Sequence, residues 1–141
     1  MNWILDTCVI SEFSKARPSS QVIDWIEGCD EETLFMSVLT IGELARGIAR
    51  LPKSTRRAGL EHWLHAEIVP KFADRVLPIT DRIATLWGQA SGAADAKGRP
   101  VPTVDGLIAA TAVIHDCTVV TRNRQDFEHS GARYFDPWSN Q

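Results

Sequence analysis

The sequence predicts a single α/β domain whose central sheet has four or five mainly parallel strands. Short apolar runs alternate with longer helical stretches and are joined by loops of ordinary length, which favours parallel strands with right-handed crossovers. The chain has 141 residues, of which 44% are hydrophobic and 23% are charged. A chain of this length buries about 68–70% of its unfolded surface in one core. We therefore expect residues 1–141 to form one domain.

The first half of the chain already shows the alternation of strand and helix. The expected elements are, in order, a strand near residues 2–5, a short helix over 9–13, a break at 18–20, a helix with the apolar stripe Val22, Ile23, Trp25 and Ile26, a strand over 33–36, a helix ending near 51–52 and a long helix over 55–68. Ser19 or Ser20 is available to cap the second helix and Ser37 the third, because a hydroxyl oxygen accepts a free N–H of the first turn.

The second half continues the same pattern. The expected elements are a strand over 76–79, a helix with Ile83, Leu86 and Trp87 on one face, a loop over 98–102, a helix that begins at Thr103, a strand over 117–120 and a fifth strand over 133–135. Pro78 suits a strand end or an edge strand, because proline donates no ladder hydrogen bond. Thr80 and Thr103 can cap the two helices.

Nothing in the composition indicates a membrane or secreted protein. No apolar run approaches the roughly 18 residues of a membrane span, and the N-terminus lacks a signal-peptide pattern. Cys8, Cys29 and Cys117 are an odd set without Cys-x-x-Cys spacing, so neither a disulfide framework nor a zinc knuckle is indicated. We expect a cytoplasmic protein.

Four acidic residues stand at the ends of expected strands and helices. Asp6 follows the first strand, Glu43 lies just inside a helix, and Asp105 occupies a first helical turn; Asp126 follows the strand over 117–120. Ligands of open α/β sheets bind at the carboxyl ends of the strands. Carboxylates without histidine or thiolate suit Mg²⁺ or Mn²⁺. The sequence therefore predicts a metal-dependent site for hydrolysing a phosphodiester bond, with Asp6 and Asp105 as the most direct ligands.

Each acid also has a structural interpretation. Asp6 can merely cap the following helix, Asp105 can merely face the helix dipole, Glu43 alone suits a solvated position, and Asp126 alone suits a turn. It is the conjunction of the four that favours a site.

Polar residues beside the acids have candidate supporting roles. Thr7, Thr121 and Asn123 can orient the carboxylates through hydroxyl and amide groups. Arg122 can contact a scissile phosphate, or it can form a structural ion pair.

One basic cluster offsets the net charge of −3. Between residues 46 and 57 the chain has five basic residues and no acid. Arg46 and Arg50 follow Glu43 by three and seven positions, so on one helix they share its face and lead away from the carboxylate. This stripe is a candidate RNA-binding surface; the alternative is an ordinary solvated helix face.

Four strings in this order resemble the PIN domain, and in particular the VapC-type toxins of type II toxin–antitoxin pairs. They are Ile4-Leu5-Asp6-Thr7 with Val9-Ile10-Ser11-Glu12, then Ile41-Gly42-Glu43-Leu44, then the run from Val104-Asp105-Gly106 to Ala112, then Thr121-Arg122-Asn123 with Asp126-Phe127. The closing Phe135-Asp136-Pro137-Trp138 resembles the FitB-type branch. The resemblance covers nearly the whole chain.

The resemblance implies a three-layer α/β/α fold with the acids at one end and a Mg²⁺- or Mn²⁺-dependent endoribonuclease, with metal ligands at Asp6 and Asp105. The implied substrate is transfer RNA or other structured RNA, whose cleavage arrests translation. The implied partner is a small VapB-like antitoxin, whose tail lies across a helical groove and blocks the acids. A homodimer is also implied.

The chain departs from the family at two positions. The family commonly has asparagine where this chain has Cys8, and some members have an acid where it has Asn123. The non-enzymatic alternative is a PIN-like module with weak metal binding that acts with its antitoxin as a DNA-binding repressor.

Overall fold

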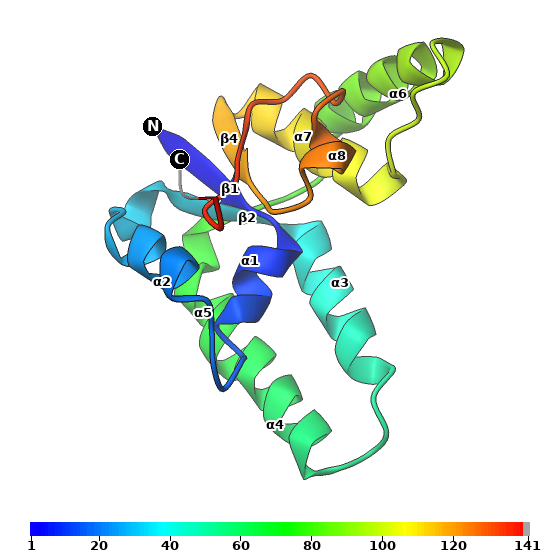
Figure 1. Cartoon of the computed structure of the whole chain (residues 1–141). Coiled ribbons are helices and arrows are strands. Elements are labelled where there is room, and N and C mark those ends of the chain that lie inside the picture. Colours follow the sequence, from blue (N-terminus) through cyan, green and yellow to red (C-terminus); the bar gives the residue numbers. More distant parts are fainter. Residues whose placement is uncertain (140–141) are drawn as a thin grey trace.

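The computed structural model describes residues 1–139, and its centre is a five-stranded sheet in which every pair of neighbours is parallel (Figure 1). The strands are β1 (Asn2–Leu5), β2 (Leu34–Ser37), β3 (Val76–Leu77), β4 (Cys117–Val120) and β5 (Tyr134–Phe135). Their order in the sheet is β3-β2-β1-β4-β5, so β1 is central and β3 and β5 are the edges. The predicted parallel α/β sheet is confirmed, with five strands.

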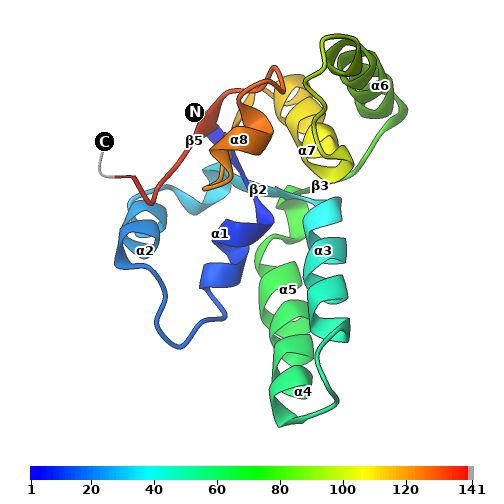
Figure 2. The same cartoon turned by 45° about the vertical axis from the view of Figure 1, so that its right-hand side comes forward.

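Eight α-helices surround this sheet in the described part of the chain. They are α1 (Thr7–Glu12), α2 (Ser20–Glu27), α3 (Val38–Ala49), α4 (Thr55–His62), α5 (Val69–Lys71), α6 (Asp81–Ala96), α7 (Thr103–Ile114) and α8 (Arg124–Phe127). A π-helical segment, Trp63–Ile68, joins α4 to α5, so the long helix expected over 55–68 continues to residue 71. Helices α1 to α5 lie on one side of the sheet and α6 to α8 on the other (Figures 1 and 2).

The pleat of the strands supplies both layers of the core. Ile4 and Val119 join the cluster under α7, whereas the next residues, Leu5 and Val120, join the cluster under α1 to α5. All four are fully buried. Because successive strand residues point to opposite faces, short apolar strands of this kind require helices on both sides. The three-layer α/β/α arrangement is therefore confirmed.

Helix caps were predicted with mixed success. Ser37 accepts the N–H of Leu39 at 3.0 Å, and Thr80 accepts the N–H of Ile83 at 3.2 Å, as expected. Thr103 does not cap α7, because it is the first helical residue and Pro102 occupies the cap position. Ser19 stands at the start of α2, but its hydroxyl makes no capping bond.

Two strands are shorter than expected. β3 ends at Leu77, directly before Pro78, and β5 begins at Tyr134. Pro78 removes a backbone donor at the point where the edge strand stops, which agrees with its expected position. The helix α8 was not expected, and it is the element that carries Asp126.

None of the helices within residues 1–139 combines the length and the apolar character that a membrane span requires.

Candidate active site

The carboxyl ends of the two central strands place Asp6 beside Thr121. Leu5 of β1 pairs with Val120 of β4, and the backbone N–H of Asp6 donates to Val120 O at 3.0 Å. Asp6 and Thr121 are the next residues of the two strands, with exposed fractions of 3% and 0%. The first acid is thus buried at the carboxyl edge of the sheet, where open α/β sheets bind ligands.

Both carboxylate oxygens of Asp6 have partners. Oδ1 accepts the backbone N–H of Thr7 at 2.8 Å, so Asp6 does cap α1. Oδ2 accepts the Thr121 hydroxyl at 2.8 Å. The Cys8 thiol lies 3.8 Å from the same Oδ2 and 3.7 Å from Thr121 Oγ1. The Asp6 side chain therefore caps α1 and is also held in a fixed orientation at the edge of the sheet.

Asn123 contacts this group through its backbone. Its N–H donates to Thr121 Oγ1 at 2.9 Å, which leaves the Thr121 hydroxyl hydrogen free to donate to Asp6. Among residues 1–139 the side-chain amide of Asn123 makes no hydrogen bond to an acid. The sequence assigned the amide a supporting role, whereas the structure gives one to the backbone.

Glu43 is joined to Asp6 through Thr7. Glu43 lies midway along α3 and is partly buried, and its Oε1 accepts the Thr7 hydroxyl at 2.5 Å. Thr7 therefore holds Asp6 through its backbone N–H and Glu43 through its side chain. This contact connects α1 to α3 next to the end of β1.

The carboxyl of Asp105 interacts electrostatically with the three other acids. Burial raises the pKa of the Asp105 carboxyl to about 7, and the charges of Asp6, Asp126 and Glu43 and a hydrogen bond with Asp126 act in the same direction. Burial also raises the pKa of Asp6, against the hydrogen bonds from Thr121 and Thr7. The topology has brought four acids, from positions 6 to 126, into one electrostatic field.

These acids are not yet arranged as metal ligands. Within residues 1–139 no three Asp, Glu, His or Cys side chains already converge on one point. Their donor set nevertheless fits a hard divalent cation, because it consists of carboxylate oxygens whose mutual repulsion a cation would relieve. Thr7 joins Asp6 and Glu43 into one pair, and Asp105 lies close enough to Asp126 for their charges to interact.

Cys8, which stands where the family commonly has asparagine, is a neutral thiol. Burial, followed by the negative charge of Asp6, raises the pKa of Cys8 to about 11. At neutral pH the thiol is therefore a weak donor toward Asp6 and adds no negative charge to the site.

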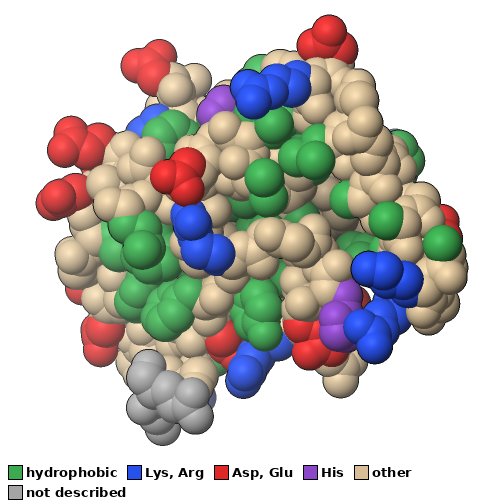
Figure 3. Space-filling view, turned by 90° about the horizontal axis from the view of Figure 1, so that it is seen from above, with side chains coloured by type: hydrophobic (Ala, Val, Ile, Leu, Met, Phe, Trp, Pro, Cys, Tyr) green, Lys and Arg blue, Asp and Glu red, His purple; other side chains and the backbone are tan. Residues whose placement is uncertain are grey.

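The basic stripe, Arg46 and Arg50, lies on the surface at the end of α3. Arg46 lies in the last turn of α3, Arg50 follows at its end, and both are exposed. Neither lies within ion-pair distance of an acid in the described part of the chain. Arg57, by contrast, is paired with Glu61 at 2.9 Å. Figure 3 shows the molecule from above the view of Figure 1, where apolar side chains occupy much of the middle of the surface and charged side chains of both signs lie mainly toward its edge.

Arg122 is exposed and stacks on an aromatic ring that the sequence did not connect with it. Its Cζ lies 4.5 Å from the centroid of the Trp138 ring. No acid between residues 1 and 139 lies within ion-pair distance of Arg122. The string Phe135-Asp136-Pro137-Trp138 was visible in the sequence, but its place beside Arg122 depends on the pairing of β5 with β4.

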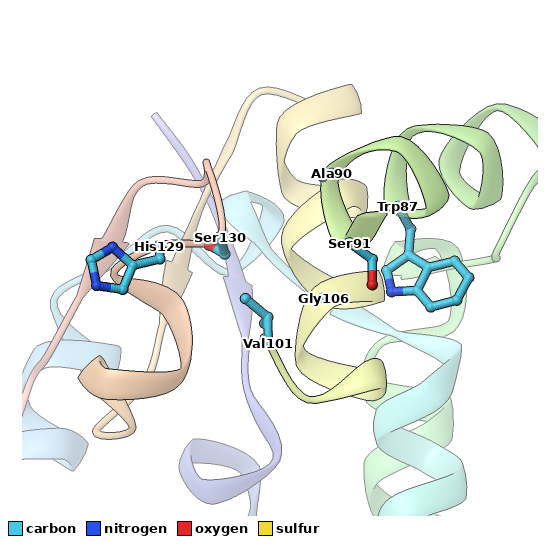
Figure 4. A pocket seen from close by; sticks show the side chains of 7 residues that line it. All are labelled: Trp87, Ala90, Ser91, Val101, Gly106, His129 and Ser130. Carbon is cyan, nitrogen blue, oxygen red and sulfur yellow. The ribbon is translucent and has the colours of Figure 1, made fainter. Parts of the chain in front are cut away.

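A small cavity beside α7 is separate from the acids. It has about 20 Å³ of free volume, the space of about one water molecule, and Figure 4 shows its lining by Trp87, Ser91, Val101, Gly106 and their neighbours. A Cβ on Gly106 would lie 2.9 Å from Trp87 Cδ1. Gly106 therefore lets α6 pack against α7 one residue away from Asp105.

Comparison with known proteins gives a consistent family assignment. The profile of the PIN domain matches residues 3–131. The VapC ribonuclease Y4jK of Sinorhizobium fredii is 38% identical over 135 residues, which cover 96% of each chain. Toxin FitB of Neisseria gonorrhoeae is 35% identical over 135 residues, covering 96% of this chain and 97% of FitB. A solved structure of FitAB bound to an IR36 DNA fragment superimposes with a TM-score of 0.91 at 32% identity, covering 99% of this chain and 97% of that one.

Proposed function

The chain belongs to the PIN-domain family, and from that premise we propose that it is the toxin of a type II toxin–antitoxin pair, an endoribonuclease that hydrolyses RNA phosphodiester bonds at its acid cluster. One observation carries the proposal. Asp105, at the start of α7, lies within the electrostatic field of Asp6, Glu43 and Asp126, and its pKa is raised to about 7 by burial and by those charges. Carboxylates that are held close together despite burial and mutual repulsion are typical of functional sites.

The chemistry follows from the donor set. Asp6 and Asp105 would hold Mg²⁺ or Mn²⁺, with Glu43 and Asp126 beside them; when bound, the cation lowers the pKa of water and neutralises charge on the phosphate oxygens. Thr121 and Thr7 fix the directions of the Asp6 oxygens. The Thr7 hydroxyl occupies Glu43 Oε1 and leaves Oε2 to accept a proton from the attacking water.

The substrate is RNA, with transfer RNA or another structured RNA as the proposed target. The similar proteins named VapC ribonuclease and Toxin FitB support the reaction and its toxic effect. Arg46 and Arg50, exposed along α3 beyond Glu43, supply positive charge for the RNA backbone. Cleavage of such an RNA would arrest translation.

The proposed partner is a VapB-like antitoxin. FitAB was solved bound to DNA, which supports a hetero-oligomer of toxin and antitoxin on operator DNA. A homodimer of this chain also stays a prediction. The second candidate function, a weakly catalytic PIN module that acts with its antitoxin as a DNA-binding repressor, is favoured by the absence of three converged metal ligands among residues 1–139.

One experiment distinguishes the nuclease from the repressor. Asp6→Asn and Asp105→Asn should each keep the fold but abolish RNA cleavage and growth arrest, because each removes a proposed metal ligand. Asp24→Asn, on the exposed side of α2, is the matched control for the loss of one charge and should cleave RNA normally. Unchanged cleavage by folded Asp6→Asn and Asp105→Asn proteins would reject the nuclease and favour the repressor.

A further inference from the structure

Arg122 and Trp138 come from the ends of two neighbouring strands. Arg122 follows Thr121 at the end of β4, and Trp138 follows β5 by three residues. The N–H of Thr121 donates to Phe135 O at 2.9 Å, so the chain that leads to Trp138 is attached to the chain that leads to Arg122. Both residues therefore stand at the carboxyl edge of the sheet, on the same side as Asp6.

The chain before Trp138 is held in a defined turn. The backbone N–H of Trp138 donates to Asp136 Oδ1 at 2.8 Å, and Pro137 is buried. This turn fixes the backbone at Trp138. The Trp138 side chain is partly buried and packs against the hydrophobic core, so its position is set before any ligand binds.

The contact with Trp138 engages no carboxylate and leaves N–H donors of Arg122 available. The guanidinium has five such donors, and its Cζ lies over the Trp138 ring. The nearby carboxylate of Glu12 already accepts from Lys15 and from the N–H of Ser19. Arg122 has no ion-pair partner of its own within residues 1–139. A planar group with free edge donors is suited to bidentate contact with a phosphate.

The acid cluster is negatively charged, so a cation beside it would help an RNA phosphate to bind there. RNA phosphates are repelled by carboxylates, and Arg122 is one residue from Thr121, which is bonded to Asp6. We propose that Arg122 contacts an RNA phosphate next to the cleaved bond and that Trp138 is the positioning residue that holds its guanidinium there. This inference rests on the proposed function and adds the C-terminal segment to the substrate-binding surface.

A double-mutant cycle tests the positioning role. Trp138→Leu should raise KM for RNA about two- to fivefold and change kcat less than twofold, because an exposed cation–π contact contributes at that level. Trp138→Tyr keeps an aromatic face and should restore most of the affinity. In an Arg122→Gln background, Trp138→Leu should have no further effect. An equal rise in KM in both backgrounds would show a merely structural role and overturn the proposal.

The phosphate contact has its own measurement. A fluorescein-labelled single-stranded oligoribonucleotide is titrated in EDTA, where no cleavage occurs, at several KCl concentrations. Arg122→Gln should reduce the slope of log affinity against log salt by about 0.7, the value for one phosphate contact on a single strand, while Arg82→Gln on exposed α6 should not change it. An unchanged slope for Arg122→Gln would overturn the contact. Absence of cleavage by the wild-type protein with Mg²⁺ or Mn²⁺ would instead reject the proposed function.

Discussion

The Thr121 hydroxyl donates a 2.8 Å hydrogen bond to Asp6 Oδ2 between the ends of two neighbouring strands. Thr121 is fully buried, and its Oγ1 also accepts the N–H of Asn123 at 2.9 Å. One hydroxyl therefore orients the first acid and satisfies the backbone of the loop that leads to Asp126. The acid cluster depends on this residue although it carries no charge.

Replacing Thr121 tests that dependence. Thr121→Val keeps the shape but removes the hydroxyl, so it should lower the free energy of unfolding by about 1–3 kcal/mol, because the buried Asp6 carboxylate loses a donor and the Asn123 N–H loses its acceptor. It should also weaken Mn²⁺ binding by about 10- to 100-fold, the usual effect of losing a group that orients a ligand. Urea unfolding and calorimetric titration with Mn²⁺ measure the two effects. Thr121→Ser, which retains the hydroxyl, should resemble wild type; a similar loss in both variants would contradict the explanation.

The basic stripe predicts a salt-dependent effect. Reversing Arg46 and Arg50 to glutamate should weaken RNA binding and flatten its dependence on salt, because two exposed positive charges at the end of α3 become negative. Mn²⁺ affinity should change little. Fluorescence anisotropy in an Asp105→Asn background avoids cleavage during the titration, and Arg82→Glu on α6 is the control. RNA affinity equal to that of the control would identify the stripe as an ordinary solvated face.

Gly106 offers a prediction about packing. Gly106→Ala places a Cβ 2.9 Å from Trp87 Cδ1 and 3.0 Å from its Nε1, so either the Trp87 side chain or the packing of α6 against α7 must shift. We expect a loss of about 1–3 kcal/mol in the free energy of unfolding. Gly88→Ala is a matched control on α6, where the new Cβ meets nothing within 4 Å, and it should stabilise the protein by up to about 1 kcal/mol. Trp87→Leu should relieve much of the Gly106→Ala penalty in the double variant; additive losses would argue against this contact.

The sequence located the acids because each follows a local signal. The apolar run of residues 2–5 predicts a strand that ends at Asp6, and Ser37 predicts the start of the helix that carries Glu43. Contacts between distant segments carry no such signal. The Thr7–Glu43 bond joins residues 36 positions apart, and its existence depends on how α1 packs against α3.

Local sequence patterns also failed to predict the short elements. α8 has four residues, too few for an apolar period, so the turn that carries Asp126 was not recognised as helical. Thr103 has a capping side chain, yet it is already the first residue of α7, and Pro102 stands at the cap position with an extended backbone. The stacking of Arg122 on Trp138 follows from the pairing of β4 with β5, which no pattern within either segment specifies.

The raised pKa of Asp105 predicts how the stability of the metal-free protein depends on pH. In the folded protein this pKa is about 7, against 3.8 ordinarily, chiefly because of burial and secondarily because of Asp6, Asp126 and Glu43. The folded state therefore binds a proton more tightly than the unfolded state. The resulting stabilisation is fully present below about pH 4 and is lost as the pH rises through about 7.

Asp105→Asn removes the carboxyl whose pKa is raised. The variant should therefore be more stable than wild type at about pH 8 in the absence of metal, although it abolishes activity. Asp105 is partly exposed, so solvent screening reduces the expected gain to about 1–2 kcal/mol. The measurement is urea unfolding in EDTA at about pH 5 and about pH 8, for variant and wild type. The difference between the two proteins isolates the contribution of Asp105 to stability, because the other titrating groups are common to both. The gain should be small at the lower pH and larger at the higher one, and Asp24→Asn should show no such trend. A difference that does not vary with pH would mean that the pKa of Asp105 is not raised in the folded protein.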